Sequence, residues 1–137
     1  KTIVSASTIF NNIIISGQYE IIDYSTAEYF TTGFEIENNT ISEIYQRTEN
    51  IKVGAEINLK TIILRTGYAK YGSPYIENDF SIENFSYGIG MNNGRYFMDV
   101  AYILNQSTSE HSLYSYVNPI KLNNTNHSVV FTLGFRY

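Results

Sequence analysis

A few carboxylates and two histidines are the side chains of this 137-residue chain whose chemistry suits a reaction. Glu20, Glu56 and Asp99 are candidates for acid–base catalysis, but no serine lies beside a plausible histidine and acid. His111 and His127 lack the paired spacing of metal ligands, and ordinary exposed polar positions explain both. With no cysteine in the chain, thiol chemistry is also excluded. The sequence therefore predicts no enzyme, no cofactor and no metal site.

Composition indicates a protein made of β-strands. The chain is 43% hydrophobic and 16% charged, and it contains 13 Tyr and 8 Phe but no Trp. Aromatic and β-branched residues favour strands. The net charge of −4 and only nine scattered Lys and Arg argue against a nucleic-acid partner. No run of about eighteen apolar residues predicts a transmembrane helix.

Alternation of polar and apolar residues with period two predicts seven strands. The expected strands cover residues 2–10, 13–24, 48–58, 61–71, 85–92, 95–104 and 127–137. Soluble strands average about five or six residues, whereas a tilted strand that crosses a bilayer needs about nine to eleven. Most of the expected strands fall in the longer class.

The connections between these strands alternate in length. Those at 11–12, 58–60 and 92–94 are short, whereas those at about 25–47, 72–84 and 105–126 are long. Short turns at one end and long extracellular loops at the other are typical of bacterial outer-membrane barrels. We therefore expect an all-β fold, an antiparallel transmembrane β-barrel in the bacterial outer membrane.

In residues 51–59, 95–104 and 128–137 the two faces differ in polarity, and residues 51–59 divide completely into an apolar and a polar set. The apolar set is expected to contact outer-membrane lipid, because a charge facing mid-bilayer lipid costs about 2–4 kcal/mol. The polar set is then expected to face the lumen. Its charged members are Glu20, Lys52, Glu56, Arg65, Asp99 and Arg136. Two interpretations remain open for them: ion pairs that hold the barrel wall and any plug, or a path for a substrate or ion.

An odd number of strands has a consequence for the whole molecule. Single-chain bacterial barrels have an even number of strands and both chain ends on the periplasmic side. Seven strands would place Lys1 on the side of the long loops and Tyr137 on the side of the short turns. We therefore expect a preceding half of the same barrel, on the N-terminal side of residues 1–137.

The first long loop carries apolar residues that are unusual for a loop. Phe30, Phe34, Ile41, Ile44 and Tyr45 are candidates for capture of a lipid-like ligand, the last three on one face if 40–46 forms a short helical turn. The alternative is that they pack on the barrel mouth or a neighbouring loop.

The last expected strand, Val129 to Tyr137, resembles the terminal strand by which the barrel-assembly machinery recognises outer-membrane proteins. Its signal residues would be Phe131, Leu133, Phe135 and Tyr137. Further matches are IKVGAE at 51–56, LRTGYAKYGSPY at 64–75, FSYGIGM at 85–91 and YFMDVAYIL at 96–104. These segments resemble the C-terminal half of FadL-type outer-membrane transporters, most closely the hemin-receptor-like branch of the Bacteroidetes.

This resemblance spans roughly residues 13–137 and implies the second half of a fourteen-stranded barrel. It implies passive uptake of hydrophobic small molecules, such as long-chain fatty acids, with no chemical step. Two alternatives stay open: a structural or docking subunit of an outer-membrane complex whose long loops bind a protein, and a soluble ligand-binding β-barrel with its apolar face inside.

Overall fold

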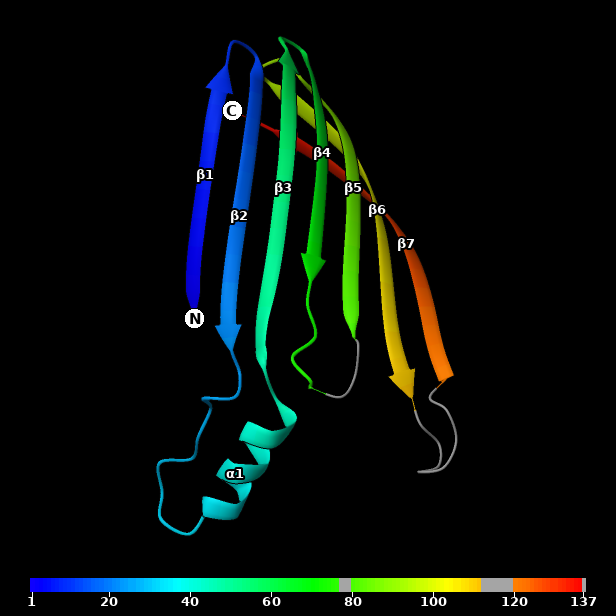
Figure 1. Ribbon diagram of the computed structural model, residues 1–137. Coiled ribbons are helices and arrows are strands. Elements are labelled where there is room, and N and C mark those ends of the chain that lie inside the picture. The colour runs from blue at the N-terminus through cyan, green and yellow to red at the C-terminus, as the bar shows by residue number, and fades with distance from the viewer. Residues whose placement is uncertain (77–79, 112–119, 137) are drawn as a thin grey trace.

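One antiparallel sheet forms most of the computed structural model, which describes residues 1–76, 80–111 and 120–136 (Figure 1). Each strand pairs with its neighbours in sequence, from β1 to β7. The strands are β1 (Thr2–Phe10), β2 (Ile13–Asp23), β3 (Arg47–Leu59), β4 (Ile62–Tyr71), β5 (Ser81–Asn92), β6 (Tyr96–His111) and β7 (Ile120–Phe135). A helix, α1 (Glu35–Ile44), lies between β2 and β3. The predicted all-β antiparallel architecture is confirmed.

The sheet is curved but open. In the described part of the chain, β1 and β7 each pair with one strand only, so the sheet does not close into a barrel. Figure 1 shows the sheet curling from β1 towards β7. Because every strand is antiparallel to the next, the two edge strands β1 and β7 run in the same direction.

Short turns lie at one end of the sheet and long connections at the other, as Figure 1 shows with α1 at the long-loop end. Three short turns each place a residue in the left-handed region: Asn11 with φ 54°, Lys60 with φ 63° and Gly94 with φ 88°. In the last of these turns the Gly94 N–H donates to Asn92 Oδ1 at 2.9 Å. These tight turns fix the register of the hairpins on either side.

The hairpin of β6 and β7 is longer than the sequence indicates. The loop expected over 105–126 is an overestimate, because β6 extends to His111 and β7 begins at Ile120. Residues 105–111 and 123–126 are polar on both faces of the strands, so no polar and apolar alternation marks them as strands. The backbone ladder continues all the same, and Thr108 Oγ1 donates to Asn123 Oδ1 at 3.2 Å.

Two other connections also differ from expectation. β5 begins at Ser81, four residues before the expected start, so the loop expected over 72–84 is shorter. The helical turn expected at 40–46 is instead the helix Glu35–Ile44. Asn39 and Thr40 have low helix propensity, so the sequence gives little sign of where this helix starts.

The two faces of the sheet differ in polarity, as the period-two alternation predicts. The inner face is the one inside the curve, and it carries the buried polar residues Glu20, Thr48 and Asn50. The outer face carries rows of exposed apolar side chains. These include Ile15, Ile51, Val53, Ile57, Leu64, Tyr87, Ile89, Met91, Tyr102, Val129, Phe131 and Leu133.

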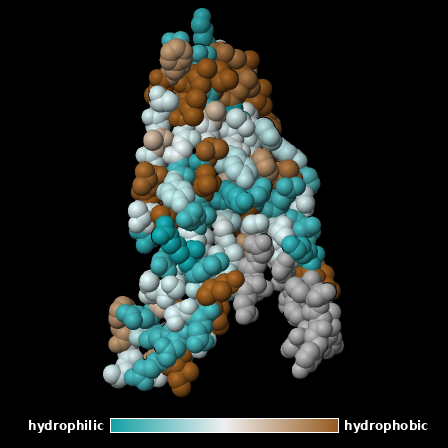
Figure 2. All heavy atoms as spheres, in the orientation of Figure 1, coloured by the Kyte–Doolittle hydropathy of each residue, from teal (hydrophilic) through white to brown (hydrophobic). Residues whose placement is uncertain are grey.

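On the side drawn in Figure 2, hydrophobic residues gather at the short-turn end and hydrophilic ones cover much of the middle and the long-loop end. No hydrophobic residue among those described is buried, so this part of the chain has no hydrophobic core of its own. No helix in the described ranges is both long and apolar enough to cross a membrane.

The left-handed turn residue Gly94 offers a test of this turn geometry. Gly94→Ala should lower the free energy of unfolding by about 1 kcal/mol, because a Cβ is disfavoured at positive φ. Gly17→Ala is the matched control: Gly17 lies within β2, and a Cβ there meets nothing within 4 Å. Urea titration of the refolded protein measures both values, and equal effects would contradict the assigned turn.

Candidate functional site

All six charged residues expected to face the lumen lie on the inner face. Lys52 and Glu56 are on β3, and Arg65 on β4 is the register partner of Glu56. Glu20 on β2 pairs with Asn50, which shares the face of Lys52. Asp99 on β6 pairs with Gly90 on one side and Thr132 on the other. Arg136, two residues beyond Gly134 and four beyond Thr132, completes the set.

Three of these six form one cluster, which we call the Arg65 cluster. Arg65 Nε donates to Glu56 Oε2 at 2.8 Å, and Arg65 Nη1 donates to Asp99 Oδ1 at 2.7 Å. The guanidinium therefore bridges β3 and β6, reaching across the intervening strand β5. Charge-assisted hydrogen bonds of this length are the stronger kind. Both of these partners of Arg65 lie within the sheet itself.

Glycine at position 90 makes room for the contact between Arg65 and Asp99, which passes over β5. A Cβ built on Gly90 would collide with the carboxylate of Asp99 and lie 3.6 Å from Arg65 Nη1. At Gly88, one step along the same face, a Cβ would meet Arg65 Cβ and Val100 O at an ordinary 3.6 Å. The Gly-Ile-Gly segment of β5 is therefore a place where two side chains cross over the backbone.

A second polar network lies at the long-loop end of the inner face. Glu20, which is 6% exposed, pairs with the ammonium of Lys1 and accepts from Asn50 Nδ2 at 3.4 Å. Asn50 Oδ1 accepts from the Gly72 N–H at 3.3 Å. Thr48 Oγ1 donates to the carbonyl of Ser73 at 2.8 Å. These bonds attach the segment after β4 to the ends of β2 and β3.

The two remaining cations lie against aromatic rings of the inner face. Lys52 Nζ is 5.3 Å from the ring centroid of Tyr71, and the Arg136 guanidinium is 6.0 Å from that of Phe97. The Phe97 ring covers Gly134, where a Cβ would overlap it. An aromatic ring laid over a glycine of the neighbouring strand is a known stabilising arrangement in sheets.

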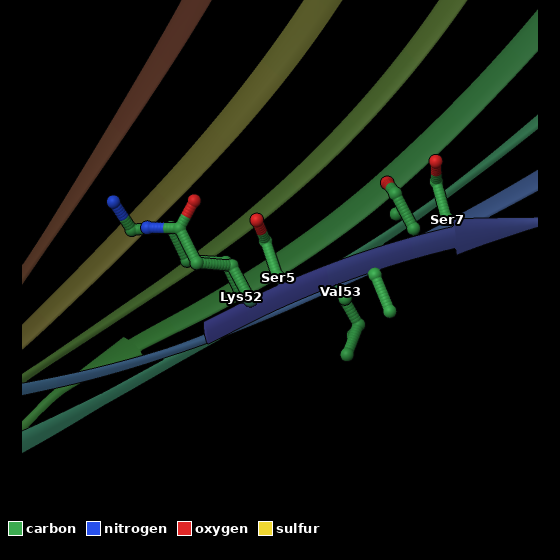
Figure 3. A pocket seen from close by; sticks show the side chains of 9 residues that line it. Ser5, Ser7, Lys52 and Val53 are labelled. Atoms are coloured by element: carbon green, nitrogen blue, oxygen red, sulfur yellow. The ribbon is translucent and has the colours of Figure 1, made fainter. Parts of the chain in front are cut away.

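A hollow of about 390 Å³ lies over β1, β2 and β3. Figure 3 shows Ser5, Ser7 and Lys52 pointing to the side on which the later strands curve, with Val53 pointing the other way. Ser16 and Gly54 continue the lining, and their register partners Ser7 and Gly67 extend the row of small residues over four strands. These small side chains leave open space over the inner face of the first strands.

The loop residues proposed for ligand capture lie beyond the strand ends, on and around α1. Phe30 is 93% exposed, Phe34 stacks on Tyr29 with centroids 5.1 Å apart, and Ile44 is exposed. Ile41 and Tyr45 are half-buried. In the described structure α1 packs against no strand, so these residues do not cover the sheet.

The residues of the expected assembly signal lie on β7. Phe131, Leu133 and Phe135 alternate on its outer face and are exposed, whereas Tyr137 is outside the described residues. His127, also on β7, has its Nδ1 2.7 Å from the Tyr102 hydroxyl. The side chain of His111 is not among those described.

Sequence reasoning missed several residues that hold these networks together. Thr48 and Asn50 have no charge to attract attention, but their place in the alternation, four and two residues before Lys52, puts them on the polar face. Phe97 lies two residues before Asp99 and so shares its face, but this alternation does not reveal its partners Gly134 and Arg136. Only the cross-strand register brings these three together, and that register is not readable from one strand.

Comparison with family models, with curated proteins and with solved structures finds no match to this chain.

A substitution at Gly90 tests the dependence of the Arg65 cluster on glycine. Gly90→Ala should lower the free energy of unfolding by about 1–3 kcal/mol, because the new methyl group displaces the Asp99 carboxylate. Gly88→Ala, where contacts are ordinary, is the matched control. In an Asp99→Ala background the cost of Gly90→Ala should largely disappear. A cost that persists there would mean that the methyl group strains something other than the cluster.

Proposed function

We propose that this chain is part of the wall of a bacterial outer-membrane β-barrel that allows passive uptake of hydrophobic small molecules, such as long-chain fatty acids. The observation that carries the proposal is the polarity of the sheet: exposed apolar residues cover the outer face, and the buried polar residues lie on the inner face. A soluble β-barrel has the reverse arrangement, with its apolar face inside.

The height of the apolar face fits a membrane. On β3 the outer face is apolar at alternate positions from Ile51 to Leu59, a span of nine residues. This matches the nine to eleven residues with which a tilted strand crosses a bilayer. Charged residues follow at the long-loop end of the same face, where Lys70 Nζ and Glu83 Oε1 are 3.7 Å apart.

Aromatic residues lie at both borders of the apolar face, as in the girdles of membrane barrels. Towards the long loops, Tyr68 and Phe85 are in contact with ring centroids 4.9 Å apart. At the short-turn end, Tyr96 and Phe135 meet edge to face at 5.4 Å. Both pairs lie on the outer face, at the depths that suit interfacial aromatics.

Closure of the barrel requires further strands. β1 and β7 run in the same direction, so an antiparallel ring needs an odd number of additional strands between their free edges. If two copies of this sheet lay in one membrane orientation, β7 of one copy would lie parallel to β1 of the other, and the ring would not be fully antiparallel. Seven more strands, from the preceding half of the same barrel, would give the even number that such barrels have.

The small residues of the inner face support transport. Ser7, Ser16, Gly54 and Gly67 leave room above the first four strands, and the three acids among the six charged inner-face residues are balanced by the three bases. A hydrophobic solute therefore meets a shallow surface without a strong field on this part of the wall. The resemblance to FadL-type transporters supports the same class of solute.

A pair of arginine substitutions tests which face contacts lipid. Val53→Arg on the outer face should destabilise the protein in lipid vesicles by about 2–4 kcal/mol, because the charge would face hydrocarbon. Ser16→Arg on the inner face is the matched control and should cost much less. Urea unfolding in vesicles measures both. The lipid assignment would be wrong if Ser16→Arg were the more damaging change.

Uptake itself is tested with the full-length protein reconstituted in vesicles and a fluorescent long-chain fatty acid. Gly54→Trp should slow uptake by filling the inner face, whereas Gly17→Trp on the outer face should leave the rate unchanged. Both variants must first show the folded band on a gel. Equal rates for the wild type and protein-free vesicles would refute transport of this solute.

A further inference from the structure

We infer that the segment 24–46, which contains α1, is a docking surface for a basic, partly apolar segment of another protein. This inference goes beyond uptake through the barrel and does not depend on it. It stands on the charge of the segment, on its exposed apolar side chains and on the weak internal support of its helix.

The charge of the segment is one-sided. Residues 24–46 contain Glu28, Glu35, Glu37 and Glu43, and no Lys, Arg, Asp or His. The segment therefore carries a charge of −4, the same as the net charge of the whole chain. A partner that carries Lys or Arg would relieve this like-charge repulsion and be steered towards the surface.

Exposed apolar groups lie among these carboxylates. Phe30 is 93% exposed, Ile36 is 79% exposed and Tyr29 is 57% exposed. Exposed aromatic and aliphatic residues surrounded by polar ones are typical of protein interfaces. The same charges disfavour two other occupants, because the carboxylate of a fatty acid and the phosphate of a lipid headgroup would both be repelled.

The helix itself has little internal support. It has ten residues, its N-cap Phe34 makes no capping hydrogen bond from its side chain, and none of its residues is buried. Helices shorter than about 12–15 residues are marginal without tertiary packing. Glu35 and Glu37 in its first turn suit the positive end of the helix dipole, but its last turn contains Glu43 and no basic residue, which is unfavourable at the negative end. A basic group supplied by a partner would interact favourably with this negative end of the helix.

The surface is nevertheless held in a defined position. The Gln46 N–H donates to the carbonyl of Pro74 at 2.8 Å, and the Ile76 N–H donates to that of Ile44 at 2.9 Å. The rings of Tyr45 and Tyr75 lie 5.2 Å apart. At the other end of the helix, Asn38 accepts from the Tyr29 N–H at 2.8 Å and donates to its carbonyl. A fixed presentation of this kind lowers the entropic cost of binding.

The test uses the full-length protein in zwitterionic lipid nanodiscs and a labelled helical peptide of Lys and Leu. Two peptide controls replace every Lys by Glu or every Leu by Ser. We expect the Lys-Leu peptide to bind, both control peptides to bind much more weakly, and affinity to fall with ionic strength. Amide exchange should slow within 24–46 and not along the strands.

Protein variants locate the contact. Glu35→Gln with Glu43→Gln should weaken binding by about tenfold, a free-energy change of about 1.4 kcal/mol. The matched control, Glu49→Gln with Glu83→Gln, removes two carboxylates from the outer face near the same end of the sheet and should leave affinity unchanged. Phe30→Ser with Ile36→Ser should weaken binding without changing the charge.

The inference is overturned if the control pair weakens binding as much as the α1 pair, if the Glu-Leu peptide binds as well, or if exchange slows elsewhere. Fatty-acid uptake by the same α1 variants is measured in parallel. Unchanged uptake with lost peptide binding would separate docking from transport, and lost uptake with intact binding would return the segment to the capture hypothesis.

Discussion

The structure depends on a single constraint: every described strand has a complete backbone ladder with its neighbours, but the sheet has no hydrophobic core to pack against. Hydrogen bonding between strands satisfies the backbone polar groups regardless of the surroundings, except along the free edges of β1 and β7. Exposure of the apolar outer face to water is unfavourable, and side chains such as Val53 and Ile89 are about half exposed. A nonpolar environment is the one in which this sheet would be stable.

The inner face follows from the same constraint. Because side chains alternate, each apolar position on the outer face is flanked by positions that must point inside the curve. Polar residues there need partners within the sheet, and the Arg65 cluster supplies them with side chains from three strands. Glycine at 90 and 134 is required by the neighbours that cross it, Asp99 and Phe97, and not by any turn.

Sequence alone could predict the strands that have two unlike faces. β1 begins and ends where expected, and β3, with its divided Ile51–Leu59 segment, is correct to within one residue at each end. β6 and β7 were underestimated because residues 105–111 and 123–126 are polar on both faces. The six inner-face charges were placed by alternation, whereas the Glu56–Arg65–Asp99 contacts depend on the register of four strands, which one sequence does not fix.

The contrast between the two acidic regions explains why they suit different roles. Glu56 and Asp99 lie within the sheet, where the fixed register brings Arg65 to both of them. The four glutamates of 24–46 lie beyond the sheet, where the segment contains no base and the helix has no strand to pack on. The two carboxylates inside the sheet share the positive charge of Arg65 and are therefore partly neutralised. Those of the loop have no base within their own segment, so a basic partner would be attracted to the long-loop end of the sheet more than to the Arg65 cluster.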